Sequence, residues 1–419
     1  MTGARRPAPV QERVDADLRA LAALVDDRQP GWTRAALTEP DREARNWALE
    51  QLRAAGLVAE LDAAGNVIGR LPGSDPRAGA ILTGSHTDTV PGGGRFDGMV
   101  GFVGALEVAR ALREAGRTLR HDLVVIDFFG EEPNDFGLSC VGSRALTGQL
   151  AAEHLALRDR DGRSYAQALA ASGIDPDGID TARLGPGIDA LAFIELHIEQ
   201  GPILEQQGSQ LGLVTTITGV ARFRALFQGR RDHAGTTPMA ARQDAGCAAA
   251  GTVLAVERIA SSAETGRGTI GSVTFTPDAV NVVTERAEVF GELRSPDAQW
   301  LRQARSALLD AVGAEAGARG VQLDLEWLPG KAPTAMSPSL VDLCDEAVAD
   351  LGYRYSRMYS GAEHDAAVMA SVCPTVMLFV PSRDGRSHCP QEWTDSDDVV
   401  AGIDVLAESI LRMDQRLGG

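Results

Sequence analysis

Residues 122–132 read DLVVIDFFGEE, and this stretch decides the fold that the sequence predicts. An apolar run of this length is typical of a strand buried inside a parallel sheet. Gly130 ends the run, and Glu131 and Glu132 follow directly. Two adjacent carboxylates point in different directions, so one can bind a metal ion while the other accepts a proton from water. Taken alone, such a pair is more often a solvated acidic turn.

Other apolar runs along the chain are also followed by a polar residue that can bind a ligand. Three of them precede a histidine: residues 79–84 precede His86, residues 191–196 precede His197, and residues 375–380 precede His388. Apolar residues at helical spacing predict helices at 12–26, 40–56 and 99–115. Strands that alternate with helices indicate an α/β domain with a mostly parallel sheet flanked by helices. Ligands bind beyond the carboxyl ends of such strands, where these polar residues lie.

The middle of the chain has a different order of elements. Strands are predicted at 211–228, 271–275, 288–293 and 321–327, with helices at 245–260 and 301–318. The order strand-helix-strand-strand-helix-strand resembles a ferredoxin-like α+β unit. We therefore expect an inserted domain at residues 213–329 and a catalytic domain formed by residues 1–212 and 330–419. A chain of 419 residues also favours two domains.

A second polar cluster lies between Gly84 and Gly98. The neutral imidazole of His86 suits a borderline metal ion, and Asp88 is close enough in the sequence to orient it. Asp97 follows three glycines and precedes a predicted helix, so its carboxylate can point into the same crevice. A structural histidine beside a turn is the plainer interpretation of this stretch alone.

The other two histidines at strand ends also have polar neighbours. His197 lies between apolar residues, as a core histidine would, but Glu195 and Gln200 are costly to bury unless they converge on a ligand. Beside His388, Cys389 is a soft alternative ligand, although carboxylate-rich surroundings favour the imidazole. Five nitrogen and oxygen donors, one of them bridging, suit two divalent ions of the group Zn, Mn, Co and Ni: His86, Asp97, Glu132, His197 and His388.

Seven motifs occur in the order found in one enzyme family. They are HTDTVPGGGRFDG (86–98), FFGEEPNDF (128–136), ELHIEQGP (195–202), HAGTTPM (233–239), NVV with GELRS (281–295), SGAEHDA (360–366) and GRSHCPQEW (385–393). The sequence resembles the amidase/hydantoinase/carbamoylase branch of the aminoacylase-type dinuclear metallohydrolases. This branch includes N-carbamoyl-L-amino acid amidohydrolases, β-ureidopropionases and allantoate amidohydrolases. The resemblance covers nearly the whole chain, and ELHIEQGP with HAGTTPM is its most specific part.

The resemblance implies a role for each residue of the metal site. One ion would be held by His86 and His197, the other by Glu132 and His388, with Asp97 as the bridge between them. Glu131 would be the general base, and Asp88 would orient His86. The Asp97–Gly98 peptide bond would be cis.

The resemblance also implies that the inserted domain is a dimerisation lid. His233 would reach the neighbouring subunit's active site and stabilise an oxyanion. Asn281 and Arg294 would bind the substrate carboxylate, with Gln200 nearby. From the residues alone, a cap or turn is the plainer interpretation of Asn281, and a surface ion pair is the plainer interpretation of Arg294.

Several residues depart from the family's usual pattern, and three of them lie in the last two motifs. Glu363 stands where glycine is usual, Arg386 where an apolar residue is usual, and Cys389 where asparagine is usual. We expect Arg386 to pair with Glu363 or with an extra polar group on the substrate. These departures therefore bear on which substrate the chain accepts.

The implied reaction is hydrolysis of the carbamoyl C–N bond of an N-carbamoyl-L-amino acid or related ureido acid. Its products would be ammonia, carbon dioxide and the amino acid. An aminoacylase or exopeptidase that cleaves an ordinary amide is the alternative among enzymes. A non-catalytic metal-binding scaffold is a third hypothesis, and the intact Glu131 argues against it.

The composition limits the expected partners and location. A formal net charge of −18 argues against nucleic acid, because phosphate binding needs a clustered positive field. The N-terminal region lacks an apolar core of signal-peptide length, and no stretch approaches the roughly 20 apolar residues of a membrane span. The five scattered cysteines fit a reducing cytoplasm. The family resemblance implies a small ureido or N-carbamoyl carboxylate as the substrate and a second copy of the chain as the partner.

Overall fold

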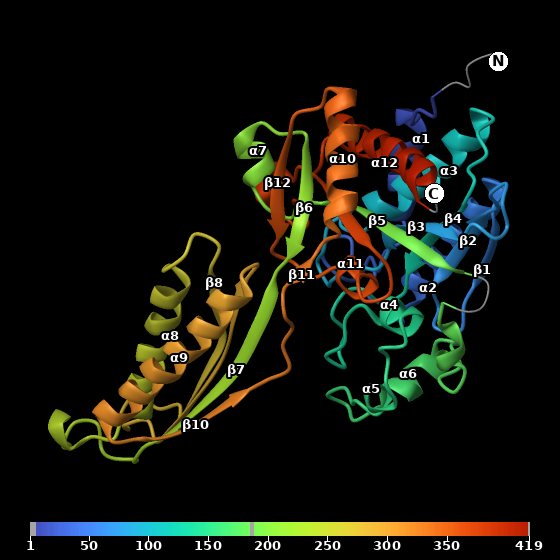
Figure 1. Cartoon of the computed structure of the whole chain (residues 1–419). Coiled ribbons are helices and arrows are strands. Elements are labelled where there is room, and N and C mark those ends of the chain that lie inside the picture. Colours follow the sequence, from blue (N-terminus) through green and yellow to red (C-terminus); the bar gives the residue numbers. More distant parts are fainter. Residues whose placement is uncertain (1–5, 185–187, 418–419) are drawn as a thin grey trace. The chain divides into compact units, whose positions relative to one another are not determined.

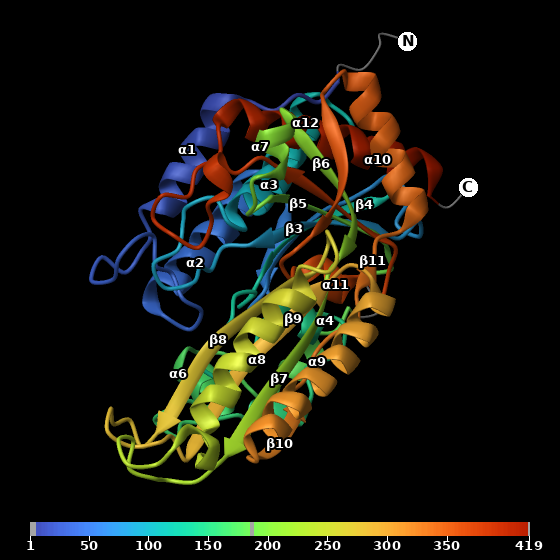
Figure 2. The ribbon, with the colours of Figure 1, turned by 90° about the vertical axis from the view of Figure 1, so that its left-hand side faces the viewer.

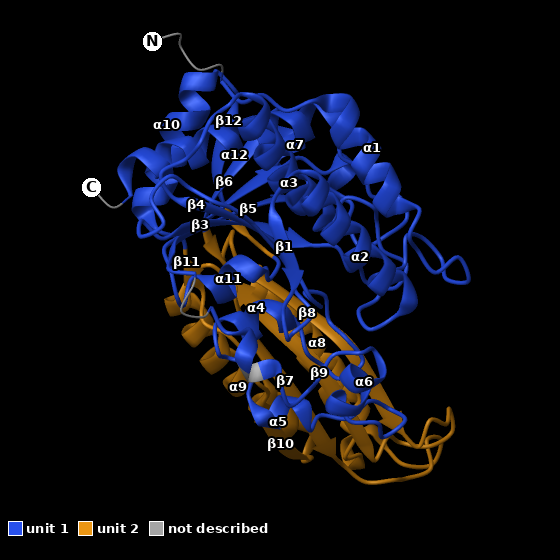
Figure 3. Cartoon of the chain, turned by 90° about the vertical axis from the view of Figure 1, so that its right-hand side faces the viewer, with its two compact units in different colours: residues 1–215, 336–358, 362–419 blue, residues 216–335, 359–361 orange. Residues whose placement is uncertain are grey.

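The computed structural model describes residues 6–184 and 188–417 (Figure 1). The chain folds into two compact units (Figure 3). Unit 1 comprises residues 1–215, 336–358 and 362–419, and unit 2 comprises residues 216–335 and 359–361. In the sequence, unit 2 is therefore an insertion into unit 1.

Unit 1 is built around one large mixed sheet. Its four central strands are parallel and neighbour one another in the order β4 (Asp122–Phe128), β3 (Ala80–His86), β5 (Ala190–Ile198) and β13 (Thr375–Val380). Antiparallel strands flank them: β2 (Val67–Leu71) and β1 (Val58–Leu61) on the β4 side, and β6 (Leu211–Ile217) on the β13 side. All residues of β3, β4 and β13 are buried, as their apolar runs require. The prediction of a mostly parallel sheet flanked by helices is confirmed.

Helices cover both faces of this sheet, and strand β5 shows which helix lies where. Successive strand residues point to opposite faces. Leu196 lies against Gly104 of α3 (Met99–Glu114) and Gly402 of α12 (Ser396–Arg416). Glu195 instead accepts a hydrogen bond from the backbone N–H of Ala366 in α11 (Asp365–Met369). His197, two residues after Glu195, therefore belongs to the face that α11 covers.

The remaining helices of unit 1 surround this framework. They are α1 (Gln11–Ala22), α2 (Glu39–Ala54), α4 (Val141–Leu146), α5 (Ala152–Leu155), α6 (Tyr165–Ala171), α7 (Ile203–Gln207) and α10 (Pro338–Leu351). Gly101 in α3 has no side chain, and a Cβ there would clash with the carbonyl oxygen of Leu196. This close approach holds the start of α3 against β5. None of the helices in the described part of the chain combines the length and apolar content that crossing a membrane requires.

Unit 2 is a two-layer α+β structure (Figure 2). Along the chain it contains β7 (Gly219–Gln228), α8 (Ala245–Ala260), β8 (Arg267–Thr276), β9 (Arg286–Ser295), α9 (Ala298–Arg319) and β10 (Gln322–Trp327). The four strands pair antiparallel in the order β10-β7-β9-β8, and α8 and α9 pack against each other and against the sheet. Asp244 and Asp297 cap the two helices by accepting hydrogen bonds from backbone N–H groups of the first turn.

Some predicted elements differ from the structure. The single strand expected at 211–228 is two strands, because β6 ends at Ile217 and β7 begins at Gly219 in a different sheet. The first helix ends at Ala22 and not at residue 26. Two strands beside β6 were not predicted: β11 (Thr334–Ala335) and β12 (Tyr355–Ser360).

Candidate metal centre

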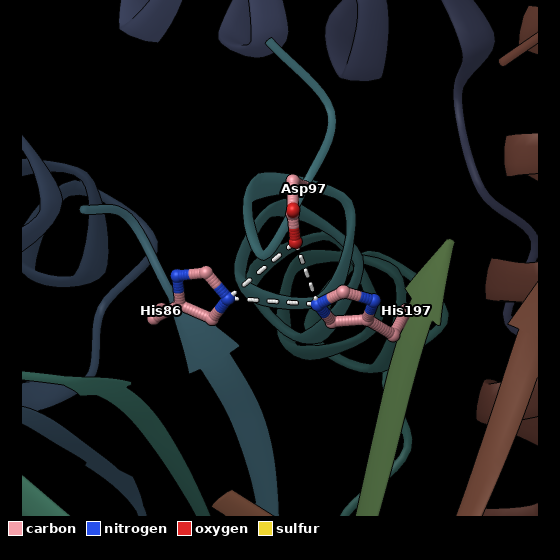
Figure 4. Close-up of side chains that lie close together, drawn as sticks. All are labelled: His86, Asp97 and His197. Atoms are coloured by element: carbon pink, nitrogen blue, oxygen red, sulfur yellow. Dashed lines mark hydrogen bonds and ion pairs between the residues drawn. The ribbon is translucent and has the colours of Figure 1, made fainter. Parts of the chain in front are cut away.

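The carboxyl ends of the parallel strands bring the predicted donors together in unit 1. His86 is the last residue of β3, and His197 is the second-last residue of β5. Glu131 and Glu132 follow β4, and His388 lies on the loop after β13. Asp97 comes just before α3 and lies between the rings of His86 and His197 (Figure 4).

The carboxylate of Asp97 faces two separate groups of donors. Its Oδ1 lies 3.1 Å from Nε2 of His197 and 3.7 Å from Nε2 of His86. Its Oδ2 lies 3.0 Å from Nε2 of His388, and that nitrogen lies 3.5 Å from Oε1 of Glu132. In each group the donor atoms lie within 4.8 Å of one another. The five predicted donors thus form two clusters that share Asp97.

Backbone hydrogen bonds fix the orientation of the two buried imidazoles. Nδ1 of His86 donates to the carbonyl oxygen of Asp88 at 3.0 Å, and Nδ1 of His197 donates to that of Ile198 at 2.9 Å. In both rings Nδ1 therefore carries a proton, and Nε2 is the nitrogen that faces Asp97. This orientation is the one that metal binding through Nε2 needs.

The contacts of Asp88 differ from the expected one. Its backbone oxygen orients His86, while its carboxylate lies 3.5 Å from Nδ1 of that ring. The carboxylate accepts hydrogen bonds from the backbone N–H groups of Glu131 and Glu132, each at 3.2 Å. Asp88 therefore fixes the turn that carries both glutamates.

Burial shapes the protonation of the acidic groups. It raises the pKa of Glu131 well above its usual range and that of Glu132 to about 8. Burial also opposes ionisation of Asp97, but hydrogen bonds from His197 and His388 hold the pKa of that carboxyl well below its usual range. Crowded carboxylates of this kind repel one another unless cations lie among them. The donor set therefore fits divalent metal ions.

Two residues that the sequence analysis did not single out also belong to the centre. His364 is buried, and its ring centroid lies 4.5 Å from that of His197. With Glu195 and His197 it forms a third group of possible metal donors. Glu392 accepts hydrogen bonds from the backbone N–H of Asp97 at 3.1 Å and from Oγ of Ser387 at 2.7 Å. It ties the Asp97 loop to the His388 loop. In the sequence, the only indication that His364 and Glu392 belong to the site was that each lies inside one of the seven motifs.

Gln200 reaches the centre, as expected for a residue close to His197. Its backbone has a positive φ of 58°, and Nε2 donates to Oδ2 of Asp97 at 2.8 Å. Nε2 also lies 3.2 Å from Nε2 of His388. Oε1 of Gln200 is buried and has no hydrogen-bond partner among the described residues.

The other three predicted site residues lie in unit 2. Nδ1 of His233 accepts hydrogen bonds from the backbone N–H groups of Gly235 and Thr236, at 3.0 and 3.2 Å. Asn281 lies beside His233, because its carbonyl oxygen accepts from the N–H of Ala234. Arg294 lies on β9 and donates through Nε to Oε1 of Glu292 at 2.6 Å and through Nη1 to the carbonyl oxygen of Gly361 at 2.9 Å.

One expectation about this region is wrong, and one of the two alternatives for Arg386 is not found. The peptide bond between Asp97 and Gly98 is not cis, and among the described residues only Thr276–Pro277 is. The chain turns there through the positive φ of Gly98, 73°. Arg386 does not pair with Glu363: it donates to Oε1 of Gln391 at 3.0 Å.

Glu363 has a different cationic neighbour. Its Oε1 lies 3.7 Å from Nη2 of Arg144 and 3.6 Å from Sγ of Cys140. The expected pair failed because α4 places Arg144 within reach of Glu363, which local sequence does not reveal.

Known proteins resemble this chain over nearly its full length. Peptidase family M20/M25/M40 matches residues 82–412. An N-carbamoyl-L-amino-acid amidohydrolase of Paenarthrobacter aurescens is 40% identical over 96% of this chain and 98% of its own length. A ureidoglycolate hydrolase of Oryza sativa subsp. japonica is 36% identical over 94% of this chain and 82% of its own. A crystal structure of an amidase of the hydantoinase/carbamoylase family from Burkholderia multivorans has a TM-score of 0.87 and 35% identity, covering 97% of this chain and 98% of that chain.

Proposed function

The chain belongs to peptidase family M20/M25/M40, and we propose that it hydrolyses the carbamoyl C–N bond of an N-carbamoyl-L-amino acid or related ureido acid. The products are ammonia, carbon dioxide and the amino acid. The main support for the proposal is the position of the Asp97 carboxylate. Its two oxygens face two donor groups, and the buried Glu131 lies beside them. This arrangement suits hydrolysis at a pair of metal ions.

The family is metal-dependent, and the clusters suit two divalent ions of the group Zn, Mn, Co and Ni. His86 and His197 would hold one, Glu132 and His388 would hold the other, and the carboxylate of Asp97 faces both groups. When bound, the ions supply positive charge that polarises the scissile carbonyl group and lowers the pKa of the attacking water.

Glu131 accepts the proton of the attacking water and returns it to the leaving nitrogen. Its position supports this role, since Oε2 lies 3.6 Å from Nε2 of His86, beside the first donor group. Its raised pKa, caused by burial, favours holding the proton between the two steps. Asp88 keeps Glu131 in place through the backbone hydrogen bond described above.

His233 stabilises the oxyanion, and it does so from the second subunit of a homodimer formed through unit 2. Because Nδ1 accepts two backbone N–H groups, the neutral ring carries its proton on Nε2. His233 is exposed, so this N–H can be donated to a group outside unit 2.

The substrate is held by three polar side chains. Nη2 of Arg294 has no partner among the described residues, and it binds the substrate carboxylate together with the side-chain amide of Asn281. The buried Oε1 of Gln200 accepts a hydrogen bond from the substrate, which supplies the partner that this oxygen lacks.

Ammonia release tests the proposal. The metal-stripped chain is reloaded with Zn, Mn, Co or Ni and assayed on N-carbamoyl-L-amino acids, N-carbamoyl-β-alanine and allantoate. We expect ammonia from one substrate group, abolished by Glu131→Gln and retained by Glu60→Gln, a change at an exposed glutamate of β1. Amine release from N-acyl or dipeptide substrates without any ammonia would replace the proposal with the aminoacylase or exopeptidase alternative.

A further inference from the structure

Unit 2 contains a hollow of about 280 Å³ that has no part in the proposed reaction. Its floor is apolar and includes Val220 at the start of β7 and Leu301 of α9, both of them buried. The side chain of Trp327, at the end of β10, forms part of the wall. The segment after β10 also lines the hollow, through Leu328 and residues 330–333. This volume is at the small end of ligand pockets, so it suits a small molecule.

Positive charge is concentrated around this hollow. Arg302 and Arg305 line it from one face of α9, three residues apart, and Lys331 adds a third cation. No carboxylate among the described residues lies within ion-pair distance of Arg302 or Arg305, although the chain has 58 acidic residues against 40 basic ones. Arg319, farther along the same helix, pairs with Glu315. Two arginines without acidic partners among the described residues thus line an apolar hollow.

The aromatic ring gives the hollow a second recognition element. The guanidinium carbon of Arg305 lies 4.3 Å from the centroid of the Trp327 ring. This cation–π contact restricts the motion of the guanidinium group, whose N–H groups can still donate to an anion. A planar anion can therefore be gripped by the arginines while its apolar body covers the floor.

We propose that this hollow binds a small organic anion, namely a carboxylate with a compact apolar body of aryl-acid type. Guanidinium groups bind carboxylates through paired N–H donors, and the buried aliphatic floor favours a hydrocarbon body over a bare inorganic anion. Such a ligand contacts both the start of β7 at Val220 and the segment that follows β10. Its binding free energy is therefore coupled to the backbone conformation of both segments.

Binding of phenylacetate to the full chain tests this site, because Trp327 supplies a local fluorescence signal. We expect saturable binding by calorimetry, with a change in tryptophan emission that Trp327→Phe removes. The double variant Arg302→Gln/Arg305→Gln should weaken binding by roughly tenfold or more. Arg258→Gln, at an exposed arginine of α8, should leave it unchanged.

Several results would overturn the proposal. These are no saturable binding to the wild-type chain, equal affinity of the double arginine variant, or equal affinity for neutral phenylacetamide. Inorganic phosphate binding more tightly than phenylacetate would also overturn it, since the site would then be a plain anion site. The measurement needs no catalysis, so its outcome is independent of the proposed reaction.

Discussion

Replacing Gly98 with alanine tests how closely the metal centre depends on its backbone. Gly98 precedes α3 with a φ of 73°, and a Cβ there would lie 2.5 Å from three atoms of the His86 ring. Carbon atoms in contact are separated by about 3.5–4.0 Å, so the ring or the turn must move by about 1 Å. A displacement of this size at a catalytic group costs roughly 100-fold in rate. The positive φ adds a backbone cost of about 1–3 kcal/mol.

Gly116, at the other end of α3, offers a matched control. Its φ is 63°, but a Cβ there would meet no atom within 4 Å. Gly116→Ala therefore bears the backbone cost alone. We expect Gly98→Ala to lose about 100-fold in kcat/KM and part of its bound metal, while Gly116→Ala keeps both and only its Tm falls. Ammonia release, elemental analysis and calorimetry measure the three quantities. If Gly98→Ala kept a kcat/KM within about threefold of Gly116→Ala, the packing argument would be refuted.

Three further predictions follow from individual contacts. Asp88→Ala should lower kcat at least about tenfold, because the turn carrying Glu131 loses charge-assisted hydrogen bonds of about 1.5–3 kcal/mol each; unchanged kcat would contradict this. Arg294→Lys should raise KM about tenfold for carboxylate substrates. Arg222 pairs with the same glutamate, Glu292, so Arg222→Lys is the control and should leave KM unchanged. Burial raises the pKa of Asp127 to about 7. A raised carboxyl pKa gives stability at low pH that is lost as pH rises through that value. The free energy of unfolding of Asp127→Asn relative to wild type should therefore increase by about 2 kcal/mol between pH 5 and pH 8. Urea unfolding of the metal-free chain measures this difference. A difference that stays constant with pH would show that the Asp127 carboxyl ionises without cost.

The central strands could be predicted from the sequence because each apolar run ends at a polar residue. The apolar runs before His86, Glu131 and His197 identified buried parallel strands, and the carboxyl ends of such strands meet at one edge. The family resemblance drawn from the seven motifs is confirmed by relatives that cover nearly the whole chain. The resemblance identified Asp97 as the bridging ligand, whereas the glycine-rich turn alone was a weak signal for this residue.

Features that depend on long-range contacts were missed or wrong. Nothing in the apolar run at 211–228 indicates that it changes sheets after Ile217, since both halves have the same strand-like composition. The hydrogen bond from Asp97 to Glu392 joins segments 295 residues apart, so it has no local signature. Charge complementarity suggested Arg386 as the partner of Glu363, but the fold brings Arg144 close instead.

The number of metal ions per chain tests the central claim most directly. Elemental analysis of the dialysed holoprotein should give two ions for the wild type and one for His388→Ala, because only the second donor group loses a ligand. Asp97→Ala should lose both, since its carboxylate serves both groups. A single ion in the wild-type chain, or two ions retained by Asp97→Ala, would contradict a centre of two metal ions bridged by Asp97.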